Sequence, residues 1–123
     1  MEAALGSEGA SLGKRGRREV FAGRMLVCVD RAFEAVGTGP IMKDYVFWSL
    51  SLDVDDIVDR PERLMDALRE VRGEAWAAVY EYKLVREVMK EFELLRTGVQ
   101  GLTGEKEPGR ILRAAMTAAW RTL

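Results

Sequence analysis

The chain has 123 residues, of which 19 are Lys or Arg and 20 are Asp or Glu, so its formal net charge is -1. This length supports one domain with a core of its own, and the nearly balanced charge excludes a strong whole-chain attraction to nucleic acid or acidic lipid. The chain has no histidine and one cysteine, which excludes metal sites built from His and Cys and removes the commonest acid–base side chain.

The apolar runs and the amide content bear on the cellular compartment of the protein and on the growth temperature of its source. The longest apolar runs, such as MLVCV at 25–29, are far shorter than the ~20 residues of a bilayer-spanning helix, and residues 1–18 lack the pattern of a secretory signal. We therefore expect a cytoplasmic protein without membrane contact, which a single cysteine also fits. The absence of asparagine and the large share of charged residues favour a thermophilic source. The excess of 14 arginines over 5 lysines fits this, but a GC-rich genome would also favour arginine.

The N-terminal segment, residues 1–18, carries four glycines and few side chains that could pack, so we expect a flexible basic arm. Its last six residues, GKRGRR, form a cluster that could neutralise several phosphates of a nucleic acid. No aromatic residue is interleaved with the arginines to stack on bases, so a solvated tail is the competing interpretation. The candidate nucleic-acid contacts are Lys14, Arg15, Arg17 and Arg18.

Apolar spacing of three and four residues predicts two helices after the arm. The first runs from about 19 to 36, ends at Gly37, and places Cys28 on its apolar face, where a buried thiol without a neighbouring base is expected. The second begins near Pro40, which suits a first helical turn. Its expected core stripe consists of Ile41, Tyr45, Trp48, Ser49 and Leu52, widened by Met42 and Val46.

An acidic turn, DVDDIVD at 53–59, follows the second helix, with at most one helical turn in it. The spacing of its aspartates lacks the glycine and final glutamate of a calcium loop, so we interpret them as solvated acids beside a helix N-terminus and expect no metal. The next stretch, DRPERLMDALREVRG, predicts a complete helix, with Asp59 as N-cap, Pro61 in the first turn and Gly73 as the stop.

The fourth predicted helix, about 74–96, is the longest, and its apolar face changes direction near Glu81. Trp76, Val79 and Tyr80 project to the side opposite the main apolar face. They are the candidate protein interface, because an exposed apolar patch marks such a surface; the alternative is that another helix covers them. Glu81 is either the partner of an arginine at a helix crossing or a carboxylate in a pocket.

The last part of the chain predicts a glycine-rich connector at 97–109 and a C-terminal amphipathic helix at about 110–123. The whole pattern predicts an all-α fold: a compact bundle of about five helices, with the helix at 74–96 central and one helical domain over 19–123. The C-terminal helix could pack on its own core or reach a second subunit.

Residues from Gly37 to about Leu95 resemble the archaeal Nitrosopumilus-type output domain, a family of small helical domains. The similarity rests on YVFWSL in an aromatic-bearing helix, on DDIVDRPERLMDALREV, and on GEA leading into a long apolar helix. It covers about half of the chain. The resemblance implies a regulatory or interaction module and transfers no catalytic residue.

The sequence therefore predicts a non-enzymatic module that binds a protein partner or a second copy of itself, without a cofactor. Nucleic-acid binding through the basic arm is the alternative function. An enzyme working with carboxylates alone is a third class, which a pocket around Glu81 with a second acid nearby would favour.

Overall fold

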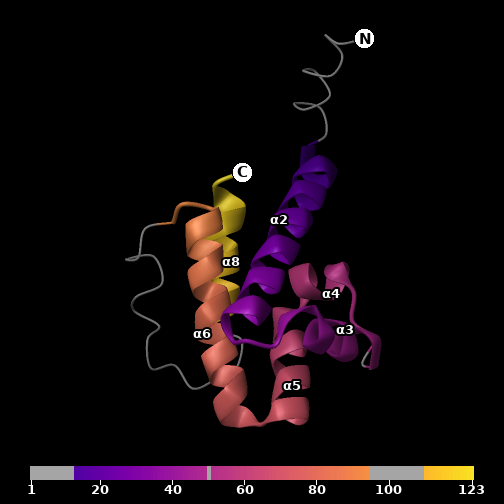
Figure 1. The fold of residues 1–123 in the computed structure, drawn as a ribbon. Helices are drawn as coiled ribbons and strands as arrows, with labels where there is room; N and C mark the ends of the chain where they lie inside the picture. The colour runs from indigo at the N-terminus through magenta and orange to yellow at the C-terminus, as the bar shows by residue number, and fades with distance from the viewer. Residues whose placement is uncertain (1–12, 50, 95–109) are drawn as a thin grey trace.

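The computed structural model describes residues 13–49, 51–94 and 110–123. Within these ranges it contains no strand, which confirms the all-α prediction (Figure 1). One helix more than the predicted five is present in the described residues, because the acidic turn forms a short helix of its own. The helices are α2 (Gly13–Ala35), α3 (Gly39–Ser49), α4 (Val54–Asp59), α5 (Pro61–Arg72), α6 (Glu74–Glu91) and α8 (Arg110–Arg121).

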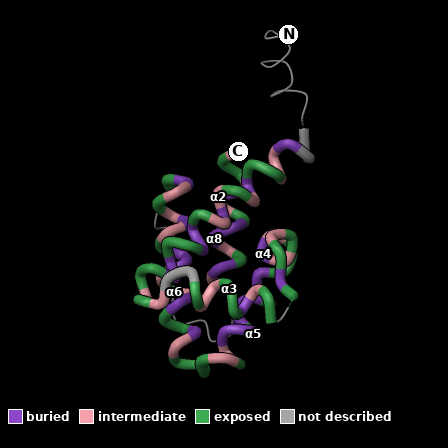
Figure 2. Tube along the Cα trace, turned by 45° about the vertical axis from the view of Figure 1, so that its right-hand side comes forward, coloured by how far each residue is buried: buried purple, intermediate pink, exposed green. Residues whose placement is uncertain are grey.

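Two helices organise the bundle. Helix α6 packs against α2, α5 and α8, and α2 runs diagonally across the bundle and also contacts α3 and α4 (Figure 1). The central place predicted for the helix at 74–96 is confirmed in α6, but that helix ends at Glu91, and the longest helix is α2, with 23 residues against 18. Burial is concentrated where these helices face one another (Figure 2). The largest fully buried side chains include Met25, Val29, Phe33, Leu64, Leu68, Tyr80, Leu84, Val88 and Leu112.

Helix α2 begins at Gly13, and not near Glu19 as the sequence indicated. The predicted arm was therefore too long, because long-range contacts hold the first turns of this helix. The guanidinium of Arg17 lies 4.4 Å from the centre of the Trp120 ring and donates a hydrogen bond of 2.9 Å to the Trp120 carbonyl. Such contacts leave no trace in local periodicity. Residues 1–12 of the arm and the predicted connector at 97–109 lie outside the described residues.

The acidic turn is a capped helix. The Asp56 amide donates to the Asp53 side chain at 3.0 Å, and the Asp53 amide donates to the Asp56 side chain at 3.1 Å, which makes a reciprocal capping box. The prediction that Asp59 is the N-cap of α5 is wrong, because Asp59 is the last residue of α4. The N-cap of α5 is Arg60, whose side chain makes no capping hydrogen bond. The predicted first-turn proline is confirmed, since α5 begins at Pro61.

A carboxylate from the centre of the molecule satisfies the start of α8. The backbone amide of Leu112 donates a hydrogen bond of 3.2 Å to Glu81 Oε2 on α6. The first amides of a helix have no partner within the helix, and a carboxylate there also opposes the positive end of the helix dipole. Glu81 interrupts the apolar face of α6 because its carboxylate anchors α8.

Of the described helices, none is long and apolar enough to cross a bilayer.

Candidate interaction surface

Helix α3 is apolar on two faces, and only one of them packs on the bundle. At 100° per residue, the pair Met42 and Val46 points in a direction about 110° away from the stripe formed by Ile41, Tyr45 and Trp48. Val46 is fully buried and Met42 is half-buried, so this pair faces the core. The other stripe faces outward, which reverses the prediction that it forms the core side of the helix.

The outward stripe is unusually exposed for its composition. Trp48 is 83% exposed, Ile41 80% and Tyr45 54%. Their spacing of four and three residues aligns them along one side of the helix. Scattered apolar side chains on a surface are ordinary, but three aligned residues that include Trp and Tyr form a contiguous patch of the kind found at protein interfaces. We call Ile41, Tyr45 and Trp48 the α3 face.

The end of α3 adds a hollow to this face. Asp44, Phe47, Trp48, Ser51 and Leu52 line it. The hollow forms because the chain reverses after α3: the Leu52 amide donates to the Phe47 carbonyl at 2.9 Å, and Ser51 adopts a left-handed φ of 53°. The reversal turns Leu52 into the core, where it is 7% exposed. A shallow recess therefore lies directly beside the exposed Trp48 ring.

Two charged side chains lie in the middle of α3: Asp44 is exposed and lines the hollow beside Trp48, and Lys43 points away from the α3 face. Lys43 reaches across to α2, where its Nζ lies 2.7 Å from Asp30 Oδ1, and only 23% of its side chain is exposed. Lys43 lies on the same side of the helix as the fully buried Val46, so the ion pair and the burial of Val46 favour the same rotation of α3 on the bundle. The α3 face itself carries no charge.

The predicted interface of Trp76, Val79 and Tyr80 is not one surface. Tyr80 is fully buried, and its hydroxyl donates a hydrogen bond of 3.1 Å to the Val29 carbonyl on α2. The ring of Trp76 stacks on that of Tyr80 with centres 5.8 Å apart and is half-buried. Only Val79 is exposed, at 52%. The prediction was wrong for Tyr80 because α2 covers this side of α6, which is the alternative that the sequence left open.

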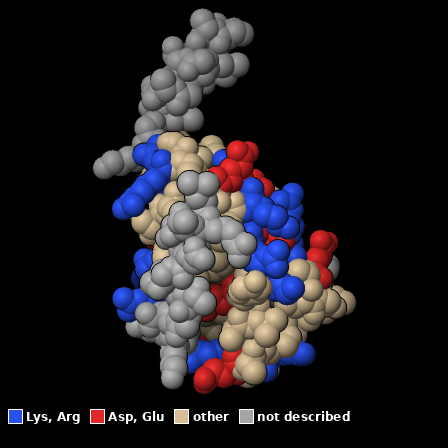
Figure 3. All heavy atoms as spheres, turned by 90° about the vertical axis from the view of Figure 1, so that its left-hand side faces the viewer, with Lys and Arg blue, Asp and Glu red and all other residues tan. Residues whose placement is uncertain are grey.

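Two of the four predicted nucleic-acid contacts, Arg17 and Arg18, bind other residues of the chain. Besides the Arg17 contacts with Trp120, Arg18 donates to both oxygens of Asp59 at 2.8 and 2.9 Å and to Asp55 at 3.1 Å. These bonds lower the pKa of Asp59 and raise that of Arg18. Lys14 belongs to the first turn of α2, as does Arg15, and their side chains lie outside the described part of the chain. No purely basic tract appears on the face in Figure 3, where both signs are interspersed among the described residues.

Other candidate chemical groups are part of the scaffold. Among the described residues, no three His, Cys, Asp or Glu side chains are grouped so that they could hold a metal. Cys28 is fully buried, and this burial raises the pKa of its thiol to about 12. A thiol of this kind is not a nucleophile near neutral pH.

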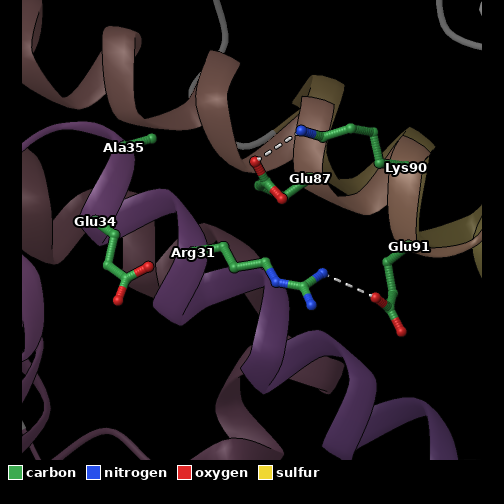
Figure 4. A pocket seen from close by; sticks show the side chains of 6 residues that line it. All are labelled: Arg31, Glu34, Ala35, Glu87, Lys90 and Glu91. Carbon is green, nitrogen blue, oxygen red and sulfur yellow. Dashed lines mark hydrogen bonds and ion pairs between the residues drawn. The ribbon is translucent and has the colours of Figure 1, made fainter.

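A charged hollow lies between α2 and α6, lined by Arg31, Glu34, Ala35, Glu87, Lys90 and Glu91 (Figure 4). Glu91 receives hydrogen bonds from Arg31 at 3.1 Å and from Arg24 at 3.0 Å, and Lys90 lies 3.4 Å from Glu87. Figure 4 shows Arg31 reaching from α2 toward Glu91 on α6, and Lys90 turned toward Glu87 along α6. This arrangement matches a helix-crossing ion-pair network, which joins α2 to α6, and it presents no pair of unengaged acids for catalysis.

The α3 face is therefore the feature that sequence reasoning placed wrongly and that the structure leaves without an internal role. Tyr and Trp are enriched at interfaces, but the covered side of α3 also carries an aromatic residue, Phe47, so residue type alone does not tell the two faces apart. Comparison with known proteins gives no match to a family model, to a curated protein or to a solved structure. The resemblance to the output domain stays a prediction.

Proposed function

We propose that the protein is a non-enzymatic interaction module that binds a protein partner, either a different protein or a second copy of itself, through the α3 face. The observation that carries the proposal is the exposure of Ile41, Tyr45 and Trp48 in one line along a helix whose opposite side is already packed. Trp and Tyr are the side chains most often found as binding hot spots. A regulatory role is the part of the proposal that the family resemblance supports.

The shape of the α3 face suits a helical or flat partner. A helix that presents apolar residues at spacings of four and three is the pattern by which one helix packs against another. The hollow beside Trp48 could receive one apolar side chain of the partner, and the buried Val46 together with the Lys43–Asp30 pair holds the helix in this rotation. The surface is thus rigidly presented before binding, which lowers the ordering cost of association.

The proposal extends to a cytoplasmic and heat-adapted setting of archaeal type. The buried, unpaired Cys28 supports a reducing compartment. Networked ion pairs, such as Arg24 and Arg31 on one Glu91, support adaptation to heat, because the cost of desolvating charges falls as temperature rises.

Matched surface variants test the proposal. Trp48→Glu places a charge on the α3 face, and Tyr82→Glu places the same charge at a side chain of α6 that is 59% exposed. Both variants should fold with unchanged helix content by circular dichroism. Affinity capture with the wild-type chain and both variants should recover a protein, identified by mass spectrometry, that Trp48→Glu loses and Tyr82→Glu keeps. Equal capture by all three chains would refute binding through the α3 face.

A further inference from the structure

We propose that the occupant of the α3 face is a second copy of this chain, with the two α3 helices packed antiparallel about a two-fold axis near Tyr45. The inference rests on the proposed function and names its partner. It follows from the symmetry of the face, from its charge and from its size.

The α3 face is nearly symmetric under reversal of the helix. Tyr45 lies four residues after Ile41 and three before Trp48. An antiparallel pair with Tyr45 against Tyr45 therefore places Ile41 of one copy beside Trp48 of the other, twice. Each contact joins one small and one large apolar side chain, which is the self-complementary arrangement that a two-fold interface requires.

The hollow at the end of α3 lies where the second copy would need it. It adjoins Trp48, and Phe47 and Leu52 contribute to its wall. In the antiparallel arrangement the N-terminal part of α3 from the other copy, which carries Ile41, faces this end. The β-branched Ile41 side chain is 80% exposed and rigid at its first torsion, so it can fill a shallow recess without a large loss of rotamer freedom.

Electrostatics permits two identical faces to meet. The net charge of -1 gives little long-range repulsion between copies. The stripe itself is uncharged, and Lys43 is held by Asp30 on the side facing the bundle. Asp44, at the rim, is exposed and can remain in water. Antiparallel packing also sets the positive end of each helix dipole beside the negative end of the other.

The size of the face fits a reversible dimer. With two exposed aromatic side chains that offer about 150–250 Å² each when fully accessible, the stripe provides on the order of 400 Å² of apolar surface per copy. A standard stable interface buries about 800 Å² per partner. The stripe would therefore form the apolar centre of the interface, and the residues around the stripe would form its rim. We therefore expect a dimer that dissociates on dilution. A lipid surface is disfavoured, because the rim includes the exposed carboxylate of Asp44, whereas acidic headgroups attract basic side chains.

Sedimentation equilibrium of the purified chain is the first test. The wild-type chain should shift from monomer to dimer as its concentration rises through the micromolar range, as should Tyr82→Glu. Trp48→Glu should raise the dissociation constant by about 100-fold or more, because each dimer loses two anchoring rings. A wild-type chain that stays monomeric at millimolar concentration overturns the inference. If such a chain still captures another protein in a Trp48-dependent way, the proposed function stands; if capture is also independent of Trp48, both fail.

Cross-linking tests the antiparallel arrangement separately. Ile41→Cys and Ser49→Cys lie at opposite ends of the outward side of α3, and the native Cys28 is fully buried and should not compete. A short bis-maleimide should link the two variants when they are mixed and give much less product with Ser49→Cys alone. Efficient linking of Ser49→Cys to itself would contradict the antiparallel pairing. Binding of monomers to neutral or acidic lipid vesicles, lost in Trp48→Glu, would assign the face to a membrane surface and overturn the inference.

Discussion

The contrast between Tyr80 and Trp48 gives the sharpest test of the packing described above, because the sequence predicted the opposite roles for them. Tyr80→Ala removes a ring that is fully buried, and Trp48→Ala removes one that is 83% exposed. The Tyr80 ring lies with its centre 4.6 Å from that of Phe33 and 5.8 Å from that of Trp76. Its hydroxyl bonds the Val29 carbonyl at 3.1 Å.

The expected losses in free energy of unfolding differ by several kcal/mol. Truncating a buried aromatic residue to alanine costs about 3–5 kcal/mol, and the lost ring contacts and hydrogen bond place Tyr80→Ala near the upper end of this range. A substitution on the surface changes stability by about 0.5 kcal/mol or less, which is the expectation for Trp48→Ala. Tyr80→Phe keeps the ring and removes only the hydrogen bond, so it should cost about 1 kcal/mol.

Urea unfolding followed by circular dichroism measures these differences. With a slope of about 2 kcal/mol per molar, Tyr80→Ala should lower the midpoint by about 2 M, and Trp48→Ala should leave it nearly unchanged. The measurement belongs at low protein concentration, where association through the α3 face does not add to stability. Equal and small shifts for both alanine variants would show that α2 does not cover Tyr80, and the assignment of core and surface would then be wrong.

Four further predictions concern single groups. Cys28 should not react with a thiol reagent at pH 8 until the protein unfolds, because burial raises its pKa to about 12; rapid labelling of the native chain would contradict this. Asp59 and Glu62 have lowered pKa values because arginines donate hydrogen bonds to them. The stabilisation from these two carboxylates is present above the unfolded carboxyl pKa of about 4 and is lost as the pH falls below that value. Glu62→Gln should therefore flatten the acid side of a plot of stability against pH, and an unchanged curve would refute the pairing. Glu81→Ala should lower stability by about 1 kcal/mol, because it removes the oxygen that accepts from the Leu112 amide at the start of α8, and an unaltered unfolding midpoint would exclude the cap. Ser51→Gly should raise the thermal midpoint slightly, because the left-handed φ of 53° costs a residue with a Cβ about 1 kcal/mol; a lower midpoint would show that the serine is preferred there.

The sequence sufficed for the helices because each carries its own local signals. Gly37 and Gly73 both adopt positive φ, at 84° and 94°, where only glycine is unstrained, and they separate helices where predicted. Pro61 likewise begins α5. Periodicity of three and four residues, together with these stops, was enough to give the fold class and most boundaries.

The candidate surface could not be predicted for a physical reason. Helix α3 offers two apolar faces, and its rotation depends on the distant partner that Lys43 finds in Asp30 and on how Val46 fits against the bundle. Tyr80 was misplaced for the same kind of reason, since its cover comes from α2, 51 residues earlier at the Val29 carbonyl. Periodicity identifies which residues share a face, but which face is covered is decided by packing between helices.

The contact between the first turns of α2 and the end of α8 has a consequence for biosynthesis. Arg17 and Trp120 are 103 residues apart and yet are joined by a hydrogen bond and a cation–π contact, and the centres of the Trp120 and Phe21 rings lie 5.4 Å apart in an edge-to-face arrangement. A nascent chain cannot close the bundle until the ribosome has released the segment through Trp120. The earlier helices must therefore wait with part of their apolar surface open, which makes that interval the one in which chaperones or premature aggregation would act on this protein.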